Sequence, residues 1–162
     1  MTKASLSGWQ DELLDRELVL TRVVDAPKEL LFSIWSDPVH LPNWFGPEGF
    51  TIETREIDIS VGGRWRFDMV APDGTRYSNR MVFTRIEPPA LIEAEHGSDA
   101  DDDPGRFMIR VTFIEQPDGR TIVSLRQLHP TVAQRDIVIG MNAVDLGYQT
   151  IDKMAAYAER TP

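Results

Sequence analysis

Three histidines are the side chains in this sequence best suited to proton transfer or metal binding: His40, His96 and His129. No two of them lie three or four residues apart, the spacing at which two histidines of one helix bind the same metal ion. His96 beside a carboxylate could act as a general acid or base, but the sequence does not place such a carboxylate. His129 precedes Pro130 at the end of an expected strand, so we interpret it as a surface or capping residue. We therefore predict no catalytic residue, no metal site and no cofactor; whether the protein is an enzyme is left open, with the negative answer favoured.

Other motifs that carry chemistry are missing or have a structural explanation. The chain has no cysteine, which excludes disulfides, thiolate zinc sites and cysteine nucleophiles. Gly62-Gly63 lacks the Gly-Lys-Ser/Thr ending of a phosphate-binding loop and precedes an expected strand, so we predict a turn or a bulge there. Asp99 and residues 101–103 form an acidic run, which we interpret as a solvated loop, with an acidic metal site as the less favoured alternative.

Length and charge narrow the class of protein. A chain of 162 residues makes one domain with a core large enough to contain a cavity. The formal net charge of -9 argues against nucleic acid as a partner, because phosphate binding needs a concentration of Lys and Arg. No apolar run approaches the roughly 20 residues of a membrane helix. The N-terminus lacks the apolar core of a secretory signal, so we expect a cytoplasmic protein without membrane insertion.

The elements that must position any site begin after an N-terminal extension, residues 1–16. Within it Leu6, Trp9, Leu13 and Leu14 have rough helical spacing. A short helix docked on the domain, a helix docked on a partner subunit and a frayed terminus all remain open, and so does a homodimer built through this segment. Residues 17–162 are expected to form a single domain.

The middle of the chain alternates apolar and polar residues, as strands with one buried face do. The alternation is complete in residues 64–69, where Trp65, Phe67 and Met69 are separated by charged residues. Leu30, Leu31, Ile34 and Trp35 recur at helical spacing instead, and Pro42 limits a second short helix to a turn or two. The expected strands are residues 17–24, 51–59, 64–69, 77–86, 91–96, 106–115 and 121–128.

The last element is predicted to be one long helix of roughly 25 residues. Thr131 and Gln134 fit a capping box at its start. Gly140 and Gly147 interrupt it, and each could mark a kink or a close approach. The apolar positions that recur every three or four residues are Ile137, Met141, Val144, Tyr148, Ile151 and Ala155.

This order of elements predicts an α+β helix-grip fold: a curved antiparallel sheet of about six or seven strands around the C-terminal helix, with two short helices after the first strand. A cavity between sheet and helix would bind a small hydrophobic or amphipathic molecule. Trp44 and Phe45 lie in a Pro/Gly-rich turn and are expected to form a mobile lip at one end. The predicted ligand-binding residues are Trp44, Phe45, Trp65, Phe67, Met69, Tyr77, Asn79, Met81, Phe83, His96, Phe107, Ile109, Gln127, Met141, Val144 and Tyr148.

The polar members of that set carry most of the information about a ligand. Asn79, His96, Gln127 or Tyr148 would cost a few kcal/mol if buried without a hydrogen bond, so each must pair with another polar group, water or a ligand. The assignment of His96 depends on the strand register. A shift by one residue would turn Glu93 and Glu95 inward in its place.

Six motifs occur in order along the chain: Ala26-Pro27 with residues 31–35, Trp44-Phe45-Gly46-Pro47, residues 61–67, Pro72-Asp73-Gly74, residues 86–89, and Gly147-Tyr148 leading into residues 151–154. In this order and spacing they resemble the activator of Hsp90 ATPase homologue 1-like family of the START-like (Bet v 1-like, polyketide cyclase-like, SRPBCC) superfamily, over roughly residues 17–160. The resemblance implies a helix-grip fold and a cavity, but not a shared reaction. It leaves two alternatives to ligand binding: an interaction protein acting on an Hsp90-type chaperone, and a cyclase- or dehydratase-like enzyme using the same cavity. Met81 stands where the family often has glycine, which would reduce the cavity.

Overall fold

The computed structural model describes residues 15–161, so the predicted N-terminal extension lies almost entirely outside the described residues. Its main element is a seven-stranded sheet in the order β1-β7-β6-β5-β4-β3-β2, in which every neighbouring pair is antiparallel. This confirms the predicted strand pattern, with boundaries that differ by a few residues at most. The strands are β1 (Glu17–Val24), β2 (Thr51–Ile57), β3 (Arg64–Val70), β4 (Arg76–Glu87), β5 (Leu91–Ser98), β6 (Phe107–Glu115) and β7 (Thr121–Leu128).

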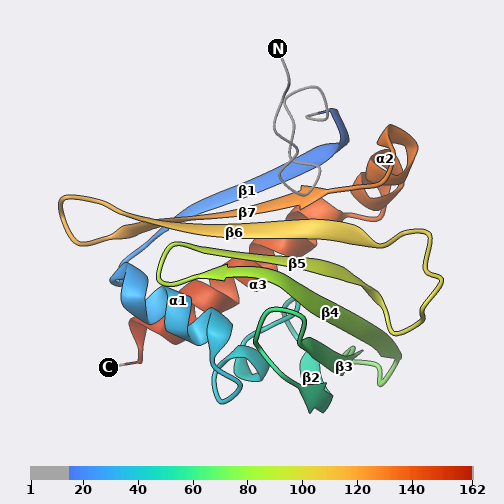
Figure 1. Ribbon diagram of the computed structural model, residues 1–162, viewed down its shortest axis with the longest axis horizontal. Coiled ribbons are helices and arrows are strands. Elements are labelled where there is room, and N and C mark those ends of the chain that lie inside the picture. Colours follow the sequence, from blue (N-terminus) through green and yellow to red (C-terminus); the bar gives the residue numbers. More distant parts are fainter. Residues whose placement is uncertain (1–14, 162) are drawn as a thin grey trace.

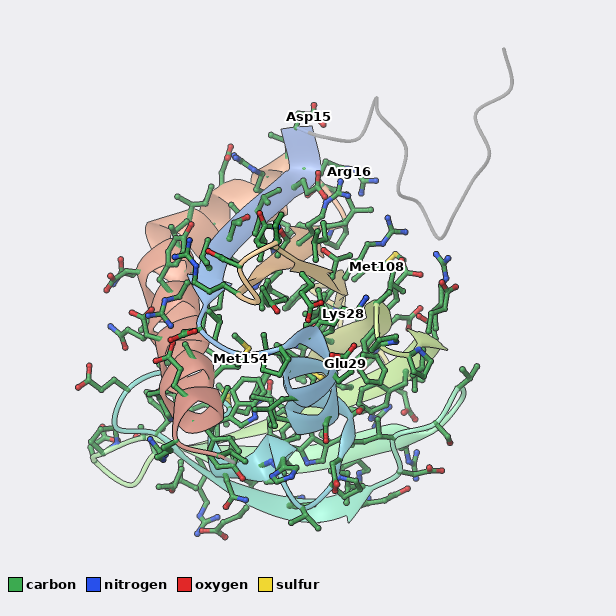
Figure 2. All side chains as sticks on the ribbon, turned by 90° about the vertical axis from the view of Figure 1, so that its left-hand side faces the viewer. Asp15, Arg16, Lys28, Glu29, Met108 and Met154 are labelled. Carbon is green, nitrogen blue, oxygen red and sulfur yellow. The ribbon has the colours of Figure 1, made fainter. Side chains whose placement is uncertain are left out.

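The sheet curves around a C-terminal helix, as the helix-grip prediction requires (Figures 1 and 2). The helices are α1 (Lys28–Ser36), α2 (Val132–Gly140) and α3 (Ala143–Glu159), with a short 3-10 turn, η2 (Leu41–Asn43), after α1. The second short helix predicted after β1 is therefore only this 3-10 turn, which contains Pro42. No helix among residues 15–161 is long and apolar enough to cross a membrane.

Alternation along the strands determines which side chains reach the core. On β3, Trp65 and Phe67 are 0% and 1% exposed, and their rings stack with centroids 3.7 Å apart. On β5, Ile92 and Ala94 are buried in the core cluster, which confirms the predicted register. Glu93 is buried too, but on the opposite face, where it accepts a hydrogen bond from Arg110 Nε at 2.7 Å.

The predicted single C-terminal helix is wrong in one respect, because it is broken between α2 and α3. Asn142 has a left-handed backbone with φ of 68°, which ends the first helix and turns the chain into the second. Thr131 does cap α2, since its Oγ1 accepts a hydrogen bond from the Gln134 backbone N–H at 3.0 Å. Of the predicted apolar stripe, Ile151 and Ala155 are buried, whereas Ile137, Met141, Val144 and Tyr148 are exposed. The buried residues of α3 are Thr150, Ile151, Met154, Ala155 and Ala158.

The structure also distinguishes the two glycines of this region. A Cβ on Gly147 would lie 2.3 Å from Leu20 Cδ1, so this glycine lets α3 approach β1 closely. A Cβ on Gly140 would meet nothing within 4 Å. Only Gly147 is therefore required by packing.

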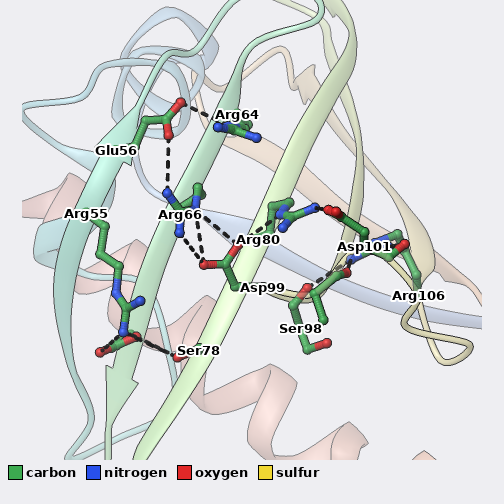
Figure 3. A network of polar contacts seen from close by, with 12 residues as sticks. Arg55, Glu56, Arg64, Arg66, Ser78, Arg80, Ser98, Asp99, Asp101 and Arg106 are labelled. Carbon is green, nitrogen blue, oxygen red and sulfur yellow. Dashed lines mark hydrogen bonds and ion pairs between the residues drawn. The ribbon is translucent and has the colours of Figure 1, made fainter.

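The outer face of the sheet carries a network of arginines and carboxylates (Figure 3). Asp99 accepts hydrogen bonds from Arg66 and Arg80, both at 2.9 Å, and its side chain is only 5% exposed. The Arg66 guanidinium, followed by Arg80, holds the pKa of Asp99 below its usual value. The acidic run predicted to be a solvated loop is therefore partly a structural ion-pair cluster. Among residues 15–161 no group of side chains is arranged to hold a metal ion.

Candidate functional site

A cavity of about 320 Å³ lies between the concave face of the sheet, the turn after η2 and the helices α2 and α3. Its lining is apolar apart from two histidines, one glutamine and one threonine, and it includes no charged side chain. The lining residues are Trp35, Phe45, Gly46, Pro47, Met69, Met81, His96, Phe107, Ile109, Leu125, Gln127, His129, Val138, Met141, Ala143, Leu146, Gly147 and Thr150.

Many of the predicted ligand-binding residues do meet at this cavity. Most of them lie on β3 to β7 and point to the concave side of the sheet, as alternation predicted. Phe45 comes from the turn after η2, and Met141 from the junction of α2 and α3. Met81 lines the cavity without filling it, so the predicted loss of space is partial. The residues brought together are Phe45, Met69, Met81, His96, Phe107, Ile109, Gln127 and Met141.

The other predicted residues do not line the cavity and, apart from Asn79, fall into two groups. One group packs side chain on side chain deeper in the core: Trp44, Trp65, Phe67 and Phe83, all 2% exposed or less. The second group lies at the surface: Tyr77, Val144 and Tyr148, which are 50%, 37% and 36% exposed. Val144 and Tyr148 were assigned inward from the spacing of the apolar stripe, of which only Ile151 and Ala155 are buried.

His96 lines the cavity as a neutral imidazole. Its Nε2 lies 2.9 Å from Asn79 Oδ1, and the Asn79 amide nitrogen donates to the Tyr77 carbonyl, so Nε2 of His96 carries the proton in the assigned orientation. Burial, with a contribution from the Arg106 charge, lowers the pKa of His96 to about 4. Its Nδ1 is therefore left as a hydrogen-bond acceptor at neutral pH. Asn79 does not line the cavity itself but fixes the tautomer of His96.

His129 is not the surface residue that its position before Pro130 suggested. It is 1% exposed, and its Nε2 lies 3.2 Å from Gln127 Oε1. Its Nδ1 is buried and has no hydrogen-bond partner among the described residues. Burial and the nearby Arg135 charge lower the pKa of His129, which keeps it neutral as well. The ring of Phe107 lies between the two histidines, with centroids 5.1 Å from His96 and 4.8 Å from His129.

The turn that contains Phe45 was expected to be a mobile lip, but it is tied to α3. Lys153 Nζ donates to the carbonyls of Pro47 and Phe50, at 3.1 Å and 3.3 Å. Phe45 is 9% exposed, and its ring centroid lies 5.3 Å from that of Trp65. Met141, which is 70% exposed and also lines the cavity, marks its mouth on the side of the α2–α3 junction.

Sequence reasoning missed a group of lining residues that the broken helix provides. Val138 reaches the cavity from α2, and Ala143, Leu146 and Thr150 reach it from α3, which starts after Asn142. The left-handed residue itself was the signal: asparagine tolerates this backbone better than most residues, and it follows a glycine by two positions. Trp35, read as an anchor of the first helix, is 3% exposed and contributes to both the core and the cavity.

Comparison with known proteins gives the family. Residues 25–159 match the family model described as Activator of Hsp90 ATPase homolog 1-like protein. The chain belongs to this family. No curated protein sequence matches the chain.

Solved structures of other proteins share the fold of this family member. A protein from Arthrobacter aurescens is similar with a TM-score of 0.83 and 22% identity, covering 94% of this chain and 91% of that chain. A protein from Mycobacterium smegmatis has a TM-score of 0.79 and 22% identity, covering 94% of this chain and 96% of that chain. The AHSA1 protein from Silicibacter pomeroyi has a TM-score of 0.70 and 25% identity, covering 86% of this chain and 95% of that chain. These likenesses support the helix-grip fold.

Proposed function

We propose that the protein binds a small, uncharged, mostly apolar molecule in the cavity between sheet and helix. The observation that carries the proposal is an apolar cavity of about 320 Å³ whose wall holds a few polar groups close together. Ligand sites of small molecules have this composition and start at about 300 Å³. An apolar cavity of about 150 Å³ holds benzene, so this one matches a molecule of one or two rings.

The polar groups indicate how such a ligand would be oriented. His96 has an acceptor nitrogen without a partner among residues 15–161, and the Gln127 amide retains donors. A hydroxyl group can donate to the first and accept from the second. A carboxylate or an ammonium group has no opposite charge in the lining, and burying an unpaired charge is far more costly than burying a hydroxyl.

A series of three probes tests this proposal: naphthalene, 1-naphthol and 1-naphthoate, titrated into the protein and followed by fluorescence. We expect saturable binding that is tightest for 1-naphthol and weakest for 1-naphthoate. One hydrogen bond contributes about 1 kcal/mol, so His96→Phe should lower the preference for 1-naphthol over naphthalene by about fivefold. Tightest binding of 1-naphthoate, or no saturable binding of any probe, would contradict the proposal.

The family description supports a second candidate, an effect on the ATPase of an Hsp90-type chaperone. Such an effect needs a protein–protein contact and does not need an open cavity. Measuring chaperone ATP hydrolysis with and without this protein tests it. Stimulation that persists when Ala143→Phe fills the cavity would favour the chaperone function over ligand binding.

A further inference from the structure

Two of the polar groups on the cavity wall are held in place by a second polar side chain. His96 is held by Asn79 and Gln127 by His129, with 2.9 Å and 3.2 Å between the bonded atoms. The ring of Phe107 lies between the two pairs, with its centroid 5.1 Å from that of His96 and 4.8 Å from that of His129. The direction of the hydrogen bond within each pair decides what a ligand must offer to His96 and to Gln127.

The hydrogen bonds of the His96 pair run in one direction only. They end on the backbone carbonyl of Tyr77, which can only accept, and Asn79 Nδ2 donates to it at 2.9 Å. The amide oxygen of Asn79 is thereby turned toward His96 Nε2, which carries the proton and donates to it. Nδ1 of the neutral ring is then an acceptor, and it has no partner among residues 15–161. Tyr77 and Asn79, which set this direction, do not line the cavity.

The Gln127 pair has no such anchor. His129 Nδ1 is buried without a partner, and the Gln127 amide nitrogen has none among the described residues. If the Gln127 amide turns over and His129 moves its proton from Nε2 to Nδ1, the hydrogen bond between the two side chains is kept. Nδ1 of His129 stays unpaired in both arrangements, so hydrogen bonding does not select between them. Gln127 can therefore offer a ligand either a donor or an acceptor, and His96 offers only an acceptor.

We propose that the ligand presents a hydrogen-bond donor, a hydroxyl or an N–H, to His96 Nδ1, and that Asn79 imposes this requirement from outside the cavity. Asn79 is then a positioning residue, because it touches His96 and not the ligand. The proposal rests on the proposed function and narrows its ligand class. An uncharged molecule with acceptors alone has nothing to offer Nδ1, whose lone pair would stay unpaired in an apolar cavity.

Indole and benzofuran test the requirement, because they differ at one position: an N–H in indole and an oxygen, which can only accept, in benzofuran. Calorimetric titration should give indole the lower dissociation constant by about fivefold, the factor that corresponds to one hydrogen bond of about 1 kcal/mol. Asn79→Leu should abolish this preference, because His96 can then carry its proton on either ring nitrogen. Asn43→Leu is the matched control and should keep the preference. The Asn43 amide also donates to a backbone carbonyl, that of Val39, but Asn43 does not line the cavity.

The tautomer of His96 gives a readout that damage to the fold alone would not move. Nitrogen NMR distinguishes a protonated ring nitrogen from an unprotonated one, and in the ligand-free protein at neutral pH we expect the proton on Nε2. In Asn79→Leu it should be shared between Nε2 and Nδ1. A proton on Nδ1 in the unaltered chain, equal binding of the two probes, or an indole preference that survives in Asn79→Leu would each overturn the proposal and leave the proposed function intact. If neither probe bound, the proposed function would fail and the proposal with it.

Discussion

Replacing Gly147 with alanine sets two effects of opposite sign against each other. Alanine in a helix interior is favoured over glycine by about 1 kcal/mol. The new Cβ, however, would lie 2.3 Å from Leu20 Cδ1, far inside the 3.5–4.0 Å of a normal carbon contact. Leu20 is 2% exposed and packed in the core cluster, so it has little room to move. Overpacking of this kind costs about 1–3 kcal/mol, so we expect a net loss of up to about 2 kcal/mol in the free energy of unfolding.

Gly140→Ala is the matched control, because its Cβ meets nothing within 4 Å. It should be neutral or stabilise by up to about 1 kcal/mol. Urea unfolding followed by circular dichroism measures both variants. The close approach also predicts coupling: in a Leu20→Ala background the clash is gone, and Gly147→Ala should become neutral or stabilising. A Gly147→Ala protein at least as stable as Gly140→Ala would refute the reasoning.

Two further predictions concern titratable groups. Because the pKa of His96 falls from 6.5 to about 4 on folding, the unfolded chain binds a proton in that window that the native chain does not. The free energy of unfolding should therefore fall by up to about 3 kcal/mol as the pH is lowered through this window. Urea titrations at several pH values measure this, and His96→Gln should remove most of the pH dependence. An unchanged dependence of the free energy of unfolding on pH in His96→Gln would contradict the prediction. Asp99→Asn should cost about 2 kcal/mol, somewhat less than a fully buried ion pair, because Arg66 and Arg80 keep some access to water. Asp102→Asn, at an exposed position of the same loop, should change stability little; equal losses in both would show that the ion pairs contribute nothing specific.

The strands were predictable because a period of two assigns every side chain to one face once a single residue is placed. Trp65 and Phe67 are buried and Ile92 and Ala94 point inward for this reason alone. The ion pairs of Asp99 could not be predicted in this way. Its partners Arg66 and Arg80 lie 33 and 19 residues away, and only the sheet register brings them together.

The helical side of the site was harder to predict. Positions 137–155 keep a spacing of three or four residues, which is equally compatible with one helix or with two. The left-handed Asn142 separates α2 from α3, and Leu146 and Thr150 line the cavity where Val144 and Tyr148 were expected. His129 follows the last strand, where alternation no longer applies, and it contacts Gln127 of β7 and Phe107 of the adjacent β6.

The central claim is that the cavity holds a small uncharged molecule, and filling it tests this most directly. Ala143 lines the cavity at the start of α3, and Ala156 is exposed on the same helix, so Ala143→Phe and Ala156→Phe are matched variants. Binding of 1-naphthol should weaken by about tenfold or more, or about 1.4 kcal/mol, in Ala143→Phe and stay unchanged in Ala156→Phe. A folded Ala143→Phe protein that binds 1-naphthol as tightly as the unaltered chain would contradict the account.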